Sequence, residues 1–180
     1  MQYEIIIAGM GGQGVLLIGQ LLAHAALIED KNVVWYPAYG PETRGGTAEC
    51  TIIISEDDIG SPIAPTPDVL IVLNQIMLDR VAPNVKPGGT IIYNSSLSDT
   101  PDRKDCKIYG IDINKLTEKA GNVKTANMVM LGAFIELIKS VKMESVKASL
   151  IEVLPERYHG SIPINKTALD LGAEEIRKLI

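Results

Sequence analysis

Six residues near the start of the chain satisfy the pattern G-x-G-x-x-G, running from Gly9 to Gly14 directly after a short apolar run. Such a loop between a strand and a helix brings bare backbone against a ligand, and the amides at the helix N-terminus favour an anion such as a phosphate. We therefore expect one wall of a ligand site to be formed by Gly9, Gly11, Gly12, Gln13 and Gly14. By itself the pattern is a weak signal, because tight turns that only pack a helix on a sheet also satisfy it.

A dinucleotide such as NAD is the first ligand that this loop suggests. An NAD site also needs an Asp or Glu about 20 residues further on, at the end of the second strand, to hold a ribose hydroxyl. The second predicted strand ends at Tyr39 without an acid, and the nearest acid beyond it is Glu42, in a loop. The sequence therefore disfavours NAD, and a free-standing nucleotide- or NAD-binding protein remains as the alternative function.

A second polar glycine loop follows the second predicted strand. In it Glu42 and Thr43 precede Arg44, whose guanidinium can fork onto a phosphate or carboxylate, and Gly45 and Gly46 keep the neighbouring backbone free of side chains. Because ligands bind at the carboxyl ends of strands in open α/β sheets, we expect this loop to lie beside the first one. The local alternative is a surface arginine bonded to Glu42 in a turn.

The remaining polar candidates have structural interpretations. Asn127 opens a predicted helix and is expected either to bond a ligand or to cap that helix. His24 is expected to be a satisfied core or interface histidine. The two cysteines, Cys50 and Cys106, cannot supply four ligands for zinc or an iron–sulfur cluster and are expected to be reduced and buried. No catalytic residue and no metal site is predicted.

The elements that must position these loops follow from apolar runs and periodicity. Strands are predicted at 3–8, 33–39, 47–55, 68–73, 90–94 and 107–111. Helices are predicted at 15–28, 75–81, 126–141, 143–153 and 167–179, the last of them capped by the segment Asn165 to Thr167. The first two strands and the helix between them should form a strand–helix–strand unit. We expect one α/β domain over residues 1–180, a doubly wound and mostly parallel sheet with helices on both faces and a Rossmann-like glycine loop after the first strand.

Composition excludes several classes of protein. The net charge is −5 and the basic residues form no cluster, which argues against a nucleic-acid partner. The longest apolar stretch, residues 15–28, is too short to span a bilayer, and the basic start of a signal peptide is lacking. We therefore expect a cytoplasmic protein with no membrane partner.

The two glycine motifs together resemble a known family. Gly-Met-Gly-Gly-Gln-Gly after the first strand, followed by Tyr-Gly-Pro-Glu-Thr-Arg-Gly-Gly after the second, resembles the gamma subunit of the 2-oxoacid:ferredoxin oxidoreductases. That family includes the pyruvate, 2-oxoglutarate, 2-oxoisovalerate and indolepyruvate enzymes. The resemblance continues through residues 65–70, Asn127-Met128, Leu131-Gly132 and residues 165–172, and so covers essentially the whole chain.

The resemblance implies a subunit of a multi-subunit oxidoreductase. Such enzymes convert a 2-oxoacid and coenzyme A to acyl-CoA and carbon dioxide and pass the electrons to ferredoxin. Thiamine diphosphate with magnesium and the iron–sulfur clusters would be held by alpha, beta and delta-type partner subunits. The chain lacks both the cysteines for a cluster and the Gly-Asp-Gly…Asn-Asn pattern of a thiamine diphosphate site. Alone, it is expected to be inactive.

The resemblance implies that this subunit binds a ligand and does not itself catalyse a chemical step. Backbone amides at Gly11 to Gly14 would meet a phosphate of coenzyme A, and Arg44 would provide charge. In the competing role, the two loops dock against a partner and shape its thiamine pocket. The choice of 2-oxoacid would lie in the partner subunits.

Overall fold

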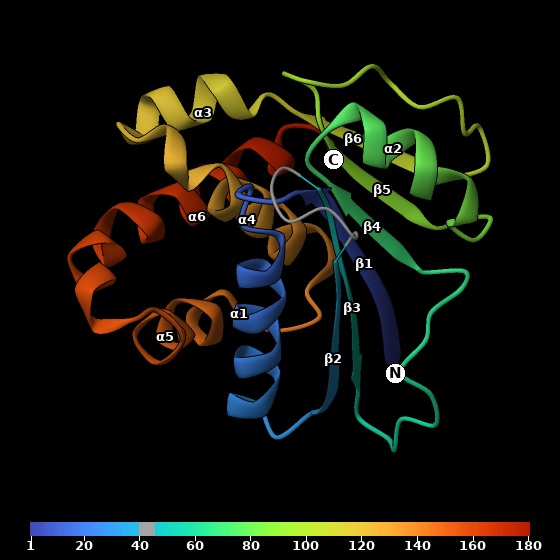
Figure 1. Cartoon of the computed structure of the whole chain (residues 1–180), viewed down its shortest axis with the longest axis horizontal. Helices are drawn as coiled ribbons and strands as arrows, with labels where there is room; N and C mark the ends of the chain where they lie inside the picture. Colours follow the sequence, from blue (N-terminus) through green and yellow to red (C-terminus); the bar gives the residue numbers. More distant parts are fainter. Residues whose placement is uncertain (40–45) are drawn as a thin grey trace.

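The computed structural model describes residues 1–39 and 46–180, and its framework is one six-stranded sheet. The strands are β1 (Gln2–Met10), β2 (Asn32–Tyr39), β3 (Thr47–Ser55), β4 (Val69–Val72), β5 (Thr90–Asn94) and β6 (Lys107–Ile111). Their order across the sheet is β2-β3-β1-β4-β5-β6 (Figure 1). The pairs β1–β4, β4–β5 and β5–β6 are parallel, whereas β3 is antiparallel to both β1 and β2. The expectation of a mostly parallel sheet is confirmed, with β3 lying between the two strands of the predicted strand–helix–strand unit.

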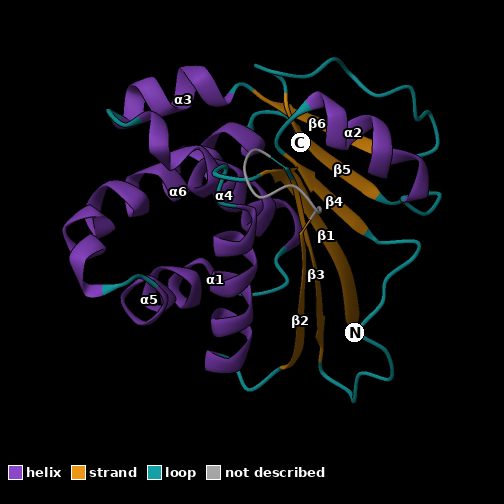
Figure 2. Cartoon of the chain, viewed as in Figure 1, coloured by secondary structure: helices purple, strands orange, loops and turns teal. Residues whose placement is uncertain are grey.

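Helices lie on both faces of the sheet, but unequally. They are α1 (Val15–Ile28), α2 (Gln75–Val81), α3 (Ile113–Ala120), α4 (Ala126–Ile138), α5 (Met143–Val153) and α6 (Ile162–Arg177), with short 3-10 turns η1 (Ala82–Asn84), η2 (Val123–Thr125) and η3 (Glu156–Ser161). Figure 2 shows α1, α3, α4, α5 and α6 on one side of the strands and α2 on the other. The first face therefore carries a thick helical layer, and the second face is covered by α2 over only part of its area.

The alternation of side chains along β1 divides the core between these faces. Ile5 and Ile7 point into the larger core, which the helical layer covers around Phe134, the one phenylalanine of the chain. Ile6 and Ala8 point the other way, into a smaller cluster with α2. Every residue of this central strand from 5 to 8 is buried, as expected for a strand packed on both faces.

Two of the predicted helix assignments are wrong. No helix was predicted between the last strand and residue 126, yet the segment after β6 forms α3, with Asp112 accepting a hydrogen bond from Lys115 N–H at its start and Gly121 in the left-handed conformation at its end. The last helix begins at Ile162 and not at residue 167. Asn165 to Thr167 therefore lies inside α6 and does not cap it, because Pro163 in the first turn already starts the helix.

Glycines set the closest helix packing in the molecule, between α4 and α6. A Cβ atom added to Gly132 would overlap the carbonyl of Leu169, and one added to Gly172 would overlap the carbonyl of Val129. Each helix thus presents a glycine to the backbone of the other. This close crossing fixes α4 relative to α6.

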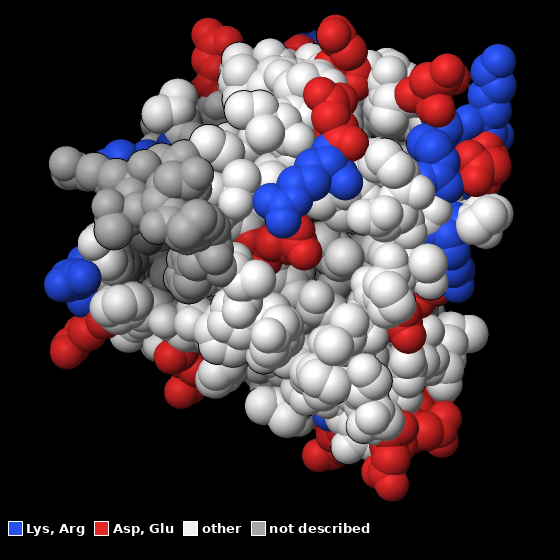
Figure 3. All heavy atoms as spheres, turned by 45° about the vertical axis from the view of Figure 1, so that its right-hand side comes forward, with Lys and Arg blue, Asp and Glu red and all other residues white. Residues whose placement is uncertain are grey.

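The second face of the sheet remains partly uncovered beside α2. Figure 3 turns this side of the molecule toward the reader and shows a broad area without charged side chains in its lower half. Tyr36 on β2 and Ile63 in the loop after β3 are 54% and 65% exposed and line a cavity of about 300 Å³ on this face. In the part of the chain that the structure describes, no helix is long and apolar enough to cross a membrane.

Candidate functional site

The glycine loop lies at the carboxyl end of β1, between its neighbours β3 and β4, and leads directly into α1. Gly12 and Gly14 have φ angles of 91° and 77°, which side chains disfavour. Gly14 is the residue that precedes the first turn of α1 and has the left-handed conformation. Gly9, at the end of β1, has no room for a side chain, because a Cβ there would be 2.8 Å from Val15 Cγ2 and from Gln13 Oε1.

After the end of β1, two of the loop's amides donate to backbone carbonyls of the protein. Gly11 N–H donates to the carbonyl of Gly46 at 2.8 Å, and Gln13 N–H donates to the carbonyl of Met10 at 3.1 Å. Among the described residues, the amides of Gly12 and Gly14 have no hydrogen-bond partner. These two amides, with the open first turn of α1, are the donors that the loop offers to an anion.

Gln13 holds the loop in place. Its Oε1 accepts from Met10 N–H at 2.7 Å and from Asn74 Nδ2 at 2.9 Å. Asn74 follows β4, and its own Oδ1 accepts from Met77 N–H at the start of α2. The side-chain oxygen of Gln13 thus ties the ends of two neighbouring strands together. Asn74 was missed from the sequence; its position just before a predicted helix is the signal that could have identified it as a cap.

Asn127 lies against the glycine loop although it is 113 positions from Gly14 in the sequence. A Cβ on Gly14 would be 2.8 Å from Asn127 Cγ and would overlap Nδ2. Asn127 is only 6% exposed, and its Oδ1 accepts from Met128 N–H at 3.0 Å. Thr125 is the residue at the N-cap position of α4, and Asn127 lies inside the helix. The prediction that Asn127 caps this helix is therefore wrong. The structure brings together Asn127 and the glycine loop, as two parts of one predicted site.

The second predicted loop is seen only at its end. Gly46 is its last residue and accepts the hydrogen bond from Gly11 of the first loop, so this end of the second loop adjoins the first, as expected. Glu42, Thr43, Arg44 and Gly45 lie outside the described residues.

The environment of the cysteines and of His24 shows no activated nucleophile. Cys50 is fully buried, its thiol lies 3.8 Å from the carbonyl of Val15, and burial raises its pKa to about 12. Cys106 is half-buried, which also raises its pKa. Both cysteines are free thiols, as predicted, although Cys106 is not fully buried. His24 is exposed on α1, so the expectation of a core histidine is wrong, and the alternative of an interface histidine stays a prediction. Within residues 1–39 and 46–180, no three His, Cys, Asp or Glu side chains form a group that could hold a metal ion.

The fold and the loop define an open-sheet α/β protein whose candidate site lies at the carboxyl edge of the strands. The family model described as pyruvate ferredoxin/flavodoxin oxidoreductase matches residues 4–175. The chain belongs to this family.

Two curated relatives differ in length from each other. The ketoisovalerate oxidoreductase subunit VorA of Methanothermobacter marburgensis is 38% identical over 181 residues, which cover 98% of this chain and 37% of the relative. The 2-oxoglutarate synthase subunit KorC of Methanocaldococcus jannaschii is 32% identical over 183 residues, which cover 99% of this chain and 96% of the relative. The chain thus spans 37% of the longer relative and nearly all of the shorter one.

Two solved structures share the fold. The gamma subunit of keto/oxoacid ferredoxin oxidoreductase from Geobacter sulfurreducens PCA has a TM-score of 0.83 and 31% identity, with 98% of this chain and 99% of that chain covered. The 2-oxoglutarate:ferredoxin oxidoreductase from Magnetococcus marinus, solved with 2-oxoglutarate, coenzyme A and succinyl-CoA bound, has a TM-score of 0.88 and 24% identity, with 99% of this chain and 32% of that chain covered. At 24% identity the second likeness shows the fold alone.

Proposed function

We propose that the chain is the gamma subunit of a multi-subunit 2-oxoacid:ferredoxin oxidoreductase. The observation that carries the proposal is full-length similarity at 31–32% identity to two proteins of nearly the same size, the KorC subunit and the Geobacter gamma subunit. The first is named as a subunit of 2-oxoglutarate synthase and the second as the gamma subunit of keto/oxoacid ferredoxin oxidoreductase. The longer VorA relative has the same domain within a larger chain, which fits a domain that works together with others.

In this role the chain contributes to oxidative decarboxylation of a 2-oxoacid to acyl-CoA without carrying the redox centres. Thiamine diphosphate, magnesium and the iron–sulfur clusters belong to alpha, beta and delta-type partners, and ferredoxin receives the electrons. The assembly role is supported by the apolar side chains exposed on the uncovered face of the sheet, Tyr36 and Ile63, which a partner subunit would bury. The protein would work in the cytoplasm.

For coenzyme A binding, the chain's own groups would act by position and charge. The amides of Gly12 and Gly14, which have no hydrogen-bond partner among the described residues, lie just before α1, where the helix dipole favours a phosphate. A Rossmann-like use of the loop, with backbone against a phosphate, fits the positive φ angles of these two glycines. Arg44 would add a bidentate cation from the second loop. Coenzyme A in the Magnetococcus enzyme is the reason to test this ligand first.

The alternative function is that of a free-standing NAD-binding protein. Calorimetric titration of the 180-residue chain with coenzyme A and with NAD distinguishes this alternative from the proposed function. The proposal predicts binding of coenzyme A and none of NAD. Tight binding of NAD with no response to coenzyme A would contradict it.

Two matched glycine variants test whether the loop holds the ligand. Gly12→Ala and Gly88→Ala both place a side chain at positive φ, 91° and 80°, in open space, so each costs stability by about 1–2 kcal/mol. Only Gly12 faces the proposed phosphate, since Gly88 lies in the turn before β5. We expect Gly12→Ala to weaken coenzyme A binding at least about fivefold and Gly88→Ala to leave it unchanged. Equal affinities in the two variants would leave assembly as the role of the loop.

A further inference from the structure

The main-chain ladder between the parallel strands β1 and β4 ends beside the glycine loop. Among the described residues its last bond runs from Leu73 N–H to the carbonyl of Ala8, at 3.0 Å. Met10 N–H, further along β1, donates instead to a side chain, Gln13 Oε1, at 2.7 Å. Beyond this point β1 leads into α1 on one face of the sheet, and β4 leads into α2 on the other (Figure 2). Ligands of open α/β sheets bind where neighbouring strands connect to opposite faces in this way.

Two side-chain amides take the place of the ladder at this point. Asn74 Nδ2 donates to Gln13 Oε1 at 2.9 Å, and Asn74 Oδ1 accepts from Met77 N–H at 3.0 Å. A backbone N–H can only donate, so the atom that faces it in each side chain must be the oxygen. Met10 N–H therefore fixes the orientation of the Gln13 amide, and Met77 N–H independently fixes that of Asn74. The two assignments agree, because together they place a nitrogen of Asn74 against an oxygen of Gln13.

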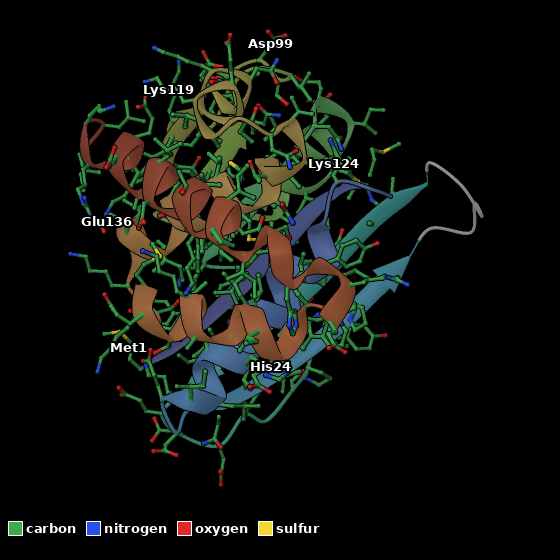
Figure 4. The ribbon with its side chains drawn as sticks, turned by 90° about the vertical axis from the view of Figure 1, so that its left-hand side faces the viewer. Met1, His24, Asp99, Lys119, Lys124 and Glu136 are labelled. Atoms are coloured by element: carbon green, nitrogen blue, oxygen red, sulfur yellow. The ribbon has the colours of Figure 1, made fainter. Side chains whose placement is uncertain are left out.

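Asn74 is itself held in place from both sides. Asn94, a β5 residue that is only 3% exposed, donates from Nδ2 to the carbonyl of Leu73 at 3.3 Å. Asp99, labelled at the top of Figure 4, donates its N–H to Gln75 Oε1 at 2.7 Å. The residues before and after Asn74 are thus bonded to β5 and to the loop that follows it. Asn74 is therefore a fixed point for the side chain that it contacts.

The orientation of the Gln13 amide decides what this side chain offers to a ligand. Its Oε1 already accepts two hydrogen bonds, which is its full capacity. Its Nε2 carries two N–H groups and has no hydrogen-bond partner among the described residues, and the side chain is half-buried. The side chain therefore offers only donors, on the same loop as the amides of Gly12 and Gly14. A ligand oxygen, and not a ligand N–H group, fits this set of donors.

We propose that Asn74 is a positioning residue for the glycine loop. It holds the Gln13 amide with Oε1 toward the ends of β1 and β4, so that Nε2 donates to an oxygen of the bound ligand. The inference rests on the function proposed above for the identity of that ligand, coenzyme A. It adds a side-chain donor to the backbone amides and names the residue that orients this donor.

Gln13→Glu and Gln13→Ala separate the donor from the support of the loop. The glutamate variant keeps an oxygen for Met10 N–H and Asn74 Nδ2 and loses only the Nε2 donor, whereas the alanine variant loses both groups. We expect Gln13→Glu to unfold in urea near the wild-type midpoint, yet to bind coenzyme A at least about tenfold more weakly than wild type. Gln13→Ala should unfold earlier but bind more tightly than Gln13→Glu. A purely structural role gives the opposite order of the two affinities, and that order would overturn the proposal.

Asn74→Ser tests the positioning role, because a serine hydroxyl still caps α2 but the Nδ2 donor is lost. We expect it to weaken coenzyme A binding about fivefold in the wild-type background and less than about twofold in the Gln13→Ala background, since its effect runs through Gln13. Asn32→Ser is the matched control: Asn32 Nδ2 also donates, to the carbonyl of Asp57, but at the start of β2, the opposite end of the sheet. It should leave the affinity unchanged. Equal losses from Asn74→Ser in the two backgrounds would contradict positioning through Gln13.

Hydrogen exchange of the Met10 amide, followed by NMR, tests the orientation without a ligand. Asn74→Asp places a carboxylate against Gln13 Oε1, and the two oxygens repel, so Met10 N–H should exchange at least about tenfold faster. In the Gln13→Ala background the same substitution should add no further change. A wild-type chain that does not bind coenzyme A, with Met10 exchange responding as expected, would contradict the ligand in the proposed function and not the role of Asn74. Coenzyme A binding with Met10 exchange unchanged by Asn74→Asp would contradict the role of Asn74 alone.

Discussion

Gly14 and Asn127 are the pair of residues on which the candidate site depends most. Gly14 combines a φ angle of 77° with direct contact to the amide of Asn127, so two separate constraints exclude a side chain there. Gly12 has a similar φ of 91° but faces open space. An alanine at Gly12 would therefore cost only the free energy of the backbone conformation, whereas an alanine at Gly14 would also cost the free energy of the packing clash.

At the residue scale we predict that Gly14→Ala destabilises the chain more than Gly12→Ala. Gly12→Ala should lower the free energy of unfolding by about 1–2 kcal/mol, and Gly14→Ala by about 1–3 kcal/mol more, because it also forces Asn127 aside. Urea unfolding measures both. In an Asn127→Ala background the excess cost of Gly14→Ala should shrink. Equal costs in the wild-type background would contradict the contact.

The thiol of Cys50 makes a second residue-scale prediction, on the pH dependence of stability. Its pKa rises from 9.0 to about 12 in the folded protein because the thiolate would be desolvated. Below pH 9 the thiol is protonated in the folded and in the unfolded protein, so its contribution to the free energy of unfolding is fully present. As pH rises from 9 toward 12 only the unfolded chain loses this proton, so stability falls by about 1.4 kcal/mol per pH unit.

Comparison of wild type with Cys50→Ala isolates this contribution from other groups that titrate in the same range. Urea unfolding at pH about 8 and about 10 should show a steeper loss of stability for wild type than for Cys50→Ala. Cys106→Ala is the control and should retain most of the wild-type slope, since that thiol is half-buried. Identical slopes for wild type and Cys50→Ala would contradict the burial of an un-ionised thiol.

At the scale of elements, the crossing of α4 and α6 positions Asn127. We predict that Gly172→Ala lowers the free energy of unfolding by about 1–3 kcal/mol, because its Cβ would enter the backbone of α4 at Val129. Gly60→Ala, in open space after β3, should change stability by less than about 1 kcal/mol. Thermal unfolding of both variants measures the difference. A fully stable Gly172→Ala variant would show that the two helices do not cross so closely.

Individual elements were predictable where a local pattern defines them. The apolar runs and caps gave α1, α2 and α5 with their observed bounds, and the strands within a few residues. The missed helix α3 is amphipathic and short, but its Asp112 cap and Gly121 terminator are local signals that were available. The start of α6 was placed too late because polar residues inside its first turns resemble a cap.

At the scale of the whole molecule, strand order and the site depend on contacts between distant residues. The insertion of antiparallel β3 between β1 and β2 is not encoded in the apolar pattern of any one strand. The approach of the two glycine loops was predictable from the rule that strand ends meet at one edge, and the Gly11–Gly46 bond agrees with it. The hydrogen bond between Gln13 and Asn74 joins two segments that no spacing rule connects.

The most direct test of the central claim is purification of the tagged chain from its host, followed by an activity assay of whatever copurifies. The account predicts a complex that reduces ferredoxin with pyruvate, 2-oxoglutarate, 2-oxoisovalerate or indolepyruvate, and that does so only when coenzyme A is present. A chain that purifies alone and binds NAD, with no coenzyme A-dependent oxidation of any of these acids in its fractions, would contradict the account.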